Sequence, residues 1–354
     1  MDTLEIFKCL ADIPSPSGFE KDIKEKLKEF IAPYVDKFIE DIHGNLFCYK
    51  INSDVDNVPT IMLIAHMDEI GLMVTYIDEN GSIYFSSLGG VDLNLLRGRK
   101  VCIIHEGERI HGVIGVRPIH MKSQANNREI ELSDMWIDIG YRDKKKIETL
   151  ISIGDPVVID SHFETINNRI IISRGCDNKS GLTAMVKTME MLATENLEYN
   201  IVAVASVQEE LGLRGAKTSG YTIQPDICIA IDVCHATDYP TIDKARYGDI
   251  KLDEGPVIPI GSDLTSGIQL KLREMATNNS IPSQVLALPG ISGTDINAIQ
   301  VNKGGCATGL LSIPCRYMHS SVEMVSIQDI NYCSDILYNV CKTYNSIFLS
   351  SQFI

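Results

Sequence analysis

The sequence predicts an α/β protein, in which a mixed β-sheet with helices is interrupted by a small inserted domain of short strands. Two continuous apolar runs, residues 60–65 (TIMLIA) and 201–207 (IVAVASV), are typical of strands that are buried on both faces. After residue 174 the pattern changes to helical spacing, as in the apolar positions of residues 182–189, and helical and strand patterns then alternate to the end of the chain.

The other elements outside the insert follow from the same patterns and from the turn residues between them. They are two helices within residues 2–32, broken at PSPSG (14–18); two short strands at about 36–50 around a turn at 43–45; and a last helix at about 326–348.

A β-rich segment interrupts this order. Between residues 71 and 166 the chain shows six short strand-like runs separated by Gly, Asp and Asn, with a helical pattern only at about 143–151. We therefore predict an inserted β-rich domain at residues 69–166, and a discontinuous domain made of residues 1–68 and 167–354.

The composition excludes several classes of protein. The 354 residues are 44% hydrophobic and 22% charged, as in ordinary globular proteins. The formal net charge of −15 argues against nucleic-acid binding, which needs basic surfaces. No run approaches the roughly 18 uninterrupted apolar residues of a membrane span. Ten cysteines without paired spacing favour the reducing cytosol, so we expect a cytoplasmic protein.

Two motifs place His, Asp and Glu where the predicted buried strands end, which is where open α/β sheets usually build active sites. His66 and Asp68 follow the first apolar run, in AHMDEIG. They share one face of an extended chain, which suits an imidazole oriented by a carboxylate, or two adjacent metal ligands. Glu209 and Glu210 follow the second run, in VQEELGLRG. Neighbouring residues point differently, so one glutamate can bind metal while the other transfers protons.

Three further residues extend this set. Asp177 precedes a predicted helix in GCDNKSG, Asp232 ends the apolar run DICIAIDV, and His319 follows an apolar run in CRYMHS. Taken singly, each has an ordinary alternative, as a helix cap, a turn residue and a core histidine respectively. His235 and Asp238, in CHATDYP, either support Asp232 or are ordinary loop residues, and the sequence leaves both interpretations open.

Taken together, two His, two Asp and two Glu form a hard donor set of nitrogen and oxygen. Such a set suits zinc, manganese or cobalt rather than a structural site made of thiolates. One bridging carboxylate, two terminal carboxylates, two imidazoles and one free glutamate are what a hydrolase with two metal ions requires.

In this order the motifs resemble the cytosolic two-metal aminopeptidases of the tetrahedral (TET) type, peptidase family M42, which includes glutamyl and leucyl aminopeptidases and proteins once labelled cellulases. The similarity spans nearly the whole chain. Besides the motifs above, it includes PSPSGFE, GPVI at 255–258, SGTDINAIQ at 292–300 and IPCRYMHSSVE at 313–323. The chain carries Asn178 and Lys179 where many relatives have Asp and Arg, which leaves metal preference open.

The resemblance implies the ligands of two metal ions. His66 and Asp232 would bind one ion, and Glu210 and His319 would bind the other. Asp177 would bridge the two ions.

The resemblance also implies the residues that act on the substrate. Glu209 would be the general base and acid, and Asp68 would orient the histidine of the first metal. Gly293, Thr294 and Asp295 would line the substrate pocket. The β-rich insert would be a dimerisation domain, and dimers would build a hollow tetrahedral dodecamer.

We therefore predict a metallo-aminopeptidase that hydrolyses N-terminal residues from short peptides, with two divalent ions per subunit, zinc first and cobalt or manganese as alternatives. One rival is a dimetal deacylase of N-acyl amino acids or peptides. Another is a non-catalytic assembly protein with a vestigial site, although retention of Glu209 with every ligand argues against it. A glycoside hydrolase is disfavoured because no metal-free acid and nucleophile pair is evident.

Overall fold

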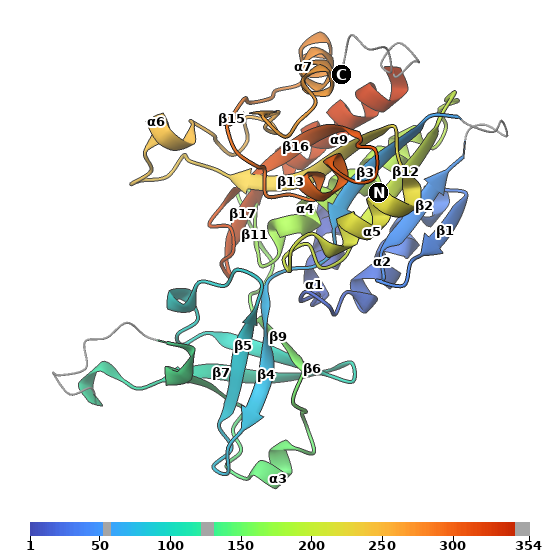
Figure 1. Ribbon diagram of the computed structural model, residues 1–354. Coiled ribbons are helices and arrows are strands. Elements are labelled where there is room, and N and C mark those ends of the chain that lie inside the picture. Colours follow the sequence, from blue (N-terminus) through green and yellow to red (C-terminus); the bar gives the residue numbers. More distant parts are fainter. Residues whose placement is uncertain (52–57, 122–130, 344–354) are drawn as a thin grey trace.

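A nine-stranded mixed sheet and a six-stranded closed barrel make up most of the β-structure in the computed structural model, which describes residues 1–51, 58–121 and 131–343 (Figure 1). In spatial order the sheet contains β1 (Lys37–Glu40), β2 (Leu46–Lys50), β12 (Asn200–Ser206), β3 (Thr60–His66), β13 (Ile227–His235), β16 (Ala307–Arg316), β17 (Glu323–Ser326), β11 (Ile170–Ser173) and β10 (Glu164–Ile166).

The barrel lies at one end of the sheet layer, where the molecule is narrower (Figure 1). Around the barrel the strands are β4 (Gly71–Ile77), β5 (Ile83–Leu88), β8 (Met135–Asp138), β7 (Glu108–Val116), β6 (Lys100–His105) and β9 (Pro156–Ile159). Its interior is a separate apolar core, which includes Leu72, Val101 and Ile137. A further pair of short strands, β14 (Ile260–Gly261) and β15 (Ala287–Leu288), is parallel.

Helices cover both faces of the large sheet. These helices are α1 (Thr3–Asp12), α2 (Lys21–Ile31), α4 (Cys176–Leu192), α5 (Arg214–Ile223), α7 (Ser266–Asn278), α8 (Ile296–Gln300) and α9 (Ile327–Thr343). By contrast, α3 (Lys144–Ile147) packs on the barrel, and α6 (Lys244–Tyr247) lies on a loop beside the sheet (Figure 1). The 3-10 turns are η1 (Ala32–Tyr34), η2 (Leu93–Leu95), η3 (Ile119–Met121) and η4 (Leu132–Asp134). Within the described part of the chain, no helix has the length and apolar character that crossing a membrane requires.

Alternate residues of each central strand enter two different cores. Ile61 and Leu63 of β3 pack with helices α1, α4 and α9, whereas Met62 and Ile64 pack with α5 and α8. Because both faces are buried, the strand reads as a continuous apolar run. The four central strands β12, β3, β13 and β16 are parallel, so their carboxyl ends meet at one edge of the sheet.

The predicted fold class is confirmed, but two predicted bounds differ. Residues 164–166, at the end of the predicted insert, form β10 of the large sheet, and the helix predicted at 143–151 is shorter. The helical pattern at 143–151 gives only α3, four residues long, because the chain turns after it and the Ser152 N–H bonds to Asp155. The last helix, α9, ends at Thr343, and the rest of its predicted span lies outside the described residues.

A buried ion group ties four segments together below the sheet edge. The Glu69 side chain, only 2% exposed, follows β3 and accepts hydrogen bonds from Arg174 Nη1 at 2.7 and 2.8 Å. The same carboxylate accepts from Lys179 Nζ and from the Ser15 N–H, both at 2.9 Å. The group therefore links the end of β3, the loop after β11, the first turn of α4 and the connection between α1 and α2.

We predict that Glu69→Ala lowers the free energy of unfolding by about 3–5 kcal/mol, because it leaves two buried cations without their partner. Urea denaturation followed by circular dichroism measures this loss. The matched control is Glu29→Ala, which removes an exposed ion pair with Lys26 (2.6 Å, Glu29 65% exposed) and should cost less than about 1 kcal/mol. Equal losses in the two variants would contradict the prediction.

Candidate metal centre

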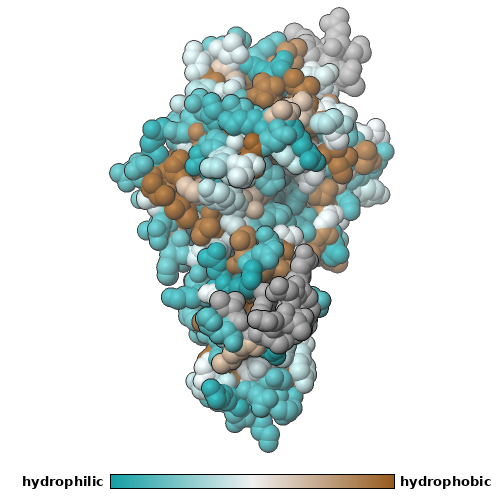
Figure 2. Space-filling model, turned by 90° about the vertical axis from the view of Figure 1, so that its left-hand side faces the viewer, coloured by the Kyte–Doolittle hydropathy of each residue, from teal (hydrophilic) through white to brown (hydrophobic). Residues whose placement is uncertain are grey.

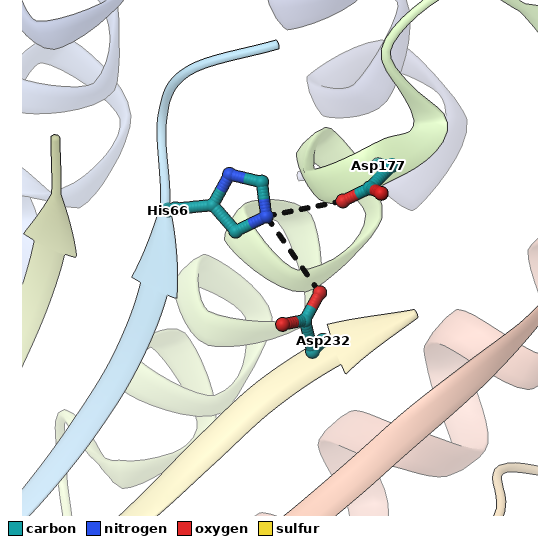
Figure 3. A group of neighbouring side chains, drawn as sticks. All are labelled: His66, Asp177 and Asp232. Atoms are coloured by element: carbon teal, nitrogen blue, oxygen red, sulfur yellow. Dashed lines mark ion pairs between the residues drawn. The ribbon is translucent and has the colours of Figure 1, made fainter. Parts of the chain in front are cut away.

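Three side chains from separate elements converge at the carboxyl edge of the sheet (Figure 3). His66 is the last residue of β3, Asp232 lies in β13, and Asp177 lies at the start of α4. His66 Nε2 lies 3.0 Å from Asp177 Oδ1 and 3.7 Å from Asp232 Oδ1. These atoms are close enough to hold one metal ion between them.

A second group of ligand atoms shares Asp177 with the first. His319 Nε2 lies 3.3 Å from Asp177 Oδ2 and 3.3 Å from Glu210 Oε1. The carboxylate of Asp177 thus offers Oδ1 to the first group and Oδ2 to the second. This is the arrangement of a carboxylate that bridges two ions.

Backbone carbonyls define the tautomer of both histidines. His66 Nδ1 lies 3.0 Å from the Asp68 carbonyl oxygen, and His319 Nδ1 lies 3.1 Å from that of Gly90. A carbonyl only accepts, so each Nδ1 carries a proton, and Nε2 is the ring atom that faces the carboxylates. A divalent cation would replace the proton on each Nε2 and would be bound by nitrogen and carboxylate oxygen.

The acidic groups interact strongly. Burial raises the pKa of Glu209 to about 10, His66 opposes this rise, and the charges of Asp232, Asp295 and Asp177 add to it. Hydrogen bonds to Asp177 and Glu210 raise the pKa of His319 to about 11. Burial opposes ionisation of Asp177, but hydrogen bonds from the two histidines hold its pKa below the usual range. Cations in this cluster would favour the ionised form of every carboxylate.

Asp68 contacts both the His66 ring and the glutamate pair. Its carbonyl contacts the ring, whereas its carboxylate Oδ1 is 3.5 Å from Nδ1. The carboxylate accepts the N–H groups of Glu209 (2.9 Å) and Glu210 (3.1 Å), and the hydroxyl of Ser17 (2.5 Å). Asp68 thus contacts the His66 ring, as expected, and in addition holds the backbone of the 208–210 turn.

Glu323 is a positioning residue that the motifs did not single out. It is buried at the start of β17 and accepts the His319 N–H at 2.7 Å and the Asp177 N–H at 3.1 Å. Burial and the charge of Asp177 raise its pKa to about 8. The only sequence signal was an acidic residue four positions after His319 in IPCRYMHSSVE, a spacing that by itself predicts no such contact.

The two groups of ligand atoms open into a cavity of about 850 Å³. Glu209, Gly293 and Thr294 line it. Asp295 does not line it, contrary to expectation: its side chain is buried and accepts a hydrogen bond from Ser206 Oγ at 2.5 Å. Much of the remaining wall is apolar and includes Val233, Ile242, Val257, Leu286, Leu288 and Leu310.

Of the two residues left open, His235 lines this cavity. Asp238 accepts a hydrogen bond from Arg316 Nε at 2.6 Å, and it accepts the Leu252 N–H at 3.1 Å. Asp238 therefore holds together the loop after β13 and the end of β16, which is a structural role.

Comparison with known proteins gives consistent matches over almost the whole chain. The model of the M42 glutamyl aminopeptidase family matches residues 44–336. A lysyl aminopeptidase of Pyrococcus furiosus is 33% identical over 331 residues, which is 92% of this chain and 93% of that protein.

Solved structures agree in fold. An aminopeptidase from the archaeon Desulfurococcus kamchatkensis has a TM-score of 0.91 and 34% identity, covering 99% of this chain and 97% of its own. The TET1 peptidase of Pyrococcus horikoshii, described as assembling into a tetrahedron or a large octahedral shell, has a TM-score of 0.86 and 30% identity, covering 97% and 100%. The chain therefore belongs to the M42 family of peptidases.

Proposed function

We propose that this protein is a metal-dependent aminopeptidase that removes N-terminal residues from short peptides. One observation carries the proposal: Asp177 is shared between two groups of ligand atoms, and Glu209, which belongs to neither group, lines the same cavity. A bridging carboxylate beside a free glutamate is what metal-assisted hydrolysis of an amide requires.

In this proposal two divalent ions bind per subunit. His66 and Asp232 hold one, Glu210 and His319 hold the other, and Asp177 holds both. When bound, such ions acidify a water molecule and polarise the carbonyl of the scissile bond. Zinc is the first choice and cobalt or manganese are alternatives, since all three accept these ligands.

The remaining steps belong to the side chains of the chain itself. Glu209 would take a proton from water and deliver it to the leaving amine. The bonds from the Glu209 and Glu210 N–H groups to Asp68 hold both glutamates in place for this transfer. The carboxylates of the cavity favour a positively charged α-amine, and the apolar wall can receive a neutral side chain.

The family description names a glutamyl aminopeptidase, whereas the Pyrococcus furiosus relative is a lysyl aminopeptidase. The similarity to these proteins therefore leaves the preferred N-terminal residue open. A deacylase could use the same metal ligands, but it would act on substrates without a free α-amine. The aminopeptidase relatives favour the peptidase, and the test below separates the two activities.

We further propose that residues 69–166 form a dimerisation domain inserted between residues 1–68 and 167–354 of a catalytic domain, and that dimers build a tetrahedral dodecamer in the cytoplasm. The dodecamer and the tetrahedral assembly described for the Pyrococcus horikoshii TET1 peptidase support the proposed assembly. On the face shown in Figure 2, apolar residues form several groups divided by hydrophilic ones, so no single patch on that face marks the interface.

The first prediction concerns Glu209→Gln. Glutamine keeps the shape but cannot accept the proton, so kcat should fall by at least about 100-fold while both ions stay bound. Turnover of aminoacyl-p-nitroanilides and metal content by mass spectrometry give the two readouts. The control is Glu195→Gln, since Glu195 pairs with Lys342 on the surface, and its activity should be unchanged. Near-normal activity of the Glu209 variant would show that another group is the base.

The substrate prediction is that the reaction requires a free α-amine. Acetylation removes the positive charge and adds bulk beside the metals, so a free tetrapeptide should be trimmed stepwise while its N-acetyl form stays intact. Mass spectrometry of the products distinguishes the outcomes. Faster hydrolysis of the acetylated peptide would support the deacylase, and internal cleavage would contradict an exopeptidase.

The assembly prediction uses the close approach of the two ends of the barrel, where Leu72 pairs with Val157. Replacing residues 72–158 by a short Gly/Ser linker should convert a large oligomer into a soluble monomer. Light scattering measures the mass of each. If particles of the deletion variant still contain twelve subunits, the barrel is not the main interface.

A further inference from the structure

The two histidines of the metal centre are held in different ways. His66 is 2% exposed, and the carbonyl that contacts its Nδ1 belongs to Asp68, two residues further along its own loop. His319 is 36% exposed, and the carbonyl at its Nδ1 belongs to Gly90, 229 residues away in the sequence. The second histidine thus depends on a contact between distant segments.

Gly90 belongs to the barrel segment of the chain. It follows β5, which ends at Leu88, and precedes η2, which begins at Leu93. Among the described residues of the segment 71–159, Gly90 alone lines the metal cavity. The barrel therefore reaches the ligands of the second metal through this one turn.

Both glycines of the turn approach these ligands closely. A Cβ added to Gly90 would lie 3.1 Å from His319 Nδ1 and 3.4 Å from its Cε1. A Cβ added to Gly89 would lie 3.0 Å from Ile70 Cγ2, 3.3 Å from Glu210 Cβ and 3.4 Å from Glu210 Oε2. Gly89 also has a φ of +78°, a left-handed conformation that favours glycine.

The backbone at His319 adds to this dependence. His319 itself has a φ of +61°, and its N–H is held by Glu323. The backbone position is therefore determined by β17, whereas Gly90 contacts the ring. Since one atom of the ring is the ligand, a shift of a few tenths of an ångström at Nδ1 changes where Nε2 points.

We propose that the Gly89–Gly90 turn is a positioning element of the second metal site, through which the barrel orients His319 and leaves room for Glu210. This rests on the proposed two-metal function. It goes further in making the inserted barrel part of the metal centre, in addition to any role in assembly. Gly89 and Gly90 are positioning residues, because they act through the two ligands.

The test measures metal binding rather than turnover. In Gly90→Ala, the added methyl group should displace the ring and weaken binding of the second Zn²⁺ by about 10–100-fold, while the first Zn²⁺ binds as in the wild type. Equilibrium dialysis of the full-length protein in chelator-buffered Zn²⁺ gives both affinities. Gly89→Ala should weaken the same ion through Glu210.

Two glycines supply matched controls. Gly304 has open space around its Cα and is not left-handed, so Gly304→Ala adds the same methyl group at a neutral position for comparison with Gly90. Gly98 lies in the barrel segment with a φ of +71° and open space, so Gly98→Ala reproduces the backbone strain of Gly89→Ala without its contacts. Both controls should bind two Zn²⁺ with wild-type affinity.

A crystal structure of the zinc-loaded wild-type protein gives an independent readout that needs no variant to fold. Nε2 of His319 should bind the metal, with Nδ1 within about 3.2 Å of the Gly90 carbonyl oxygen. Zinc on Nδ1, or a Gly90→Ala protein that binds both ions like the wild type or loses both together, would overturn the proposal. Two bound ions without peptide hydrolysis in the wild type would instead overturn the proposed function and leave this inference standing.

Discussion

Electrostatic repulsion among buried carboxylates is the constraint on which the site depends. Asp177, Glu209, Glu210 and Asp232 line one cavity, and burial with mutual repulsion raises the pKa of Glu209 to about 10. Such a cluster is stable in the ionised form only with positive charge between its members. Two metal ions would supply that charge and leave Glu209 as a carboxylate able to accept a proton. In the proposed function, the ions that activate water would therefore also keep Glu209 ionised.

Two other buried carboxylates, which belong to neither group of candidate ligands, hold the loops that carry those ligands. Asp68 accepts the N–H groups of Glu209 and Glu210, and Glu323 accepts those of Asp177 and His319. Each therefore joins two functional residues through the backbone. Hydrogen bonds from N–H groups to a carboxylate are stronger than those between neutral groups, so they can hold irregular loops to the precision that a metal site needs.

The barrel and the sheet meet at this site, although they have separate apolar cores. Parallel strands bring His66 and Asp232 to one edge of the sheet, and α4 brings Asp177 to the same place. The Gly90 turn adds the barrel to this arrangement. In the proposed two-metal site, the contact between Gly90 and His319 would couple the position of the insert to the chemistry. A flexibly attached assembly domain would leave the site independent of the insert.

The sequence by itself determined the fold class, because buried parallel strands appear as continuous apolar runs. It also identified the polar residues at the strand ends, because open α/β sheets build their active sites there. It identified His66, Asp177 and His319 as separate candidates. Only the tertiary structure decided that Asp68 holds the glutamate turn and that Asp295 lies behind the cavity. It also decided that Glu323 accepts the His319 N–H and that the Gly90 carbonyl contacts the His319 ring. These contacts join segments up to 229 residues apart. Except for the bond between Ser206 and Asp295, they involve backbone N–H or carbonyl groups, which nearly every residue type carries, so no local sequence pattern predicts them.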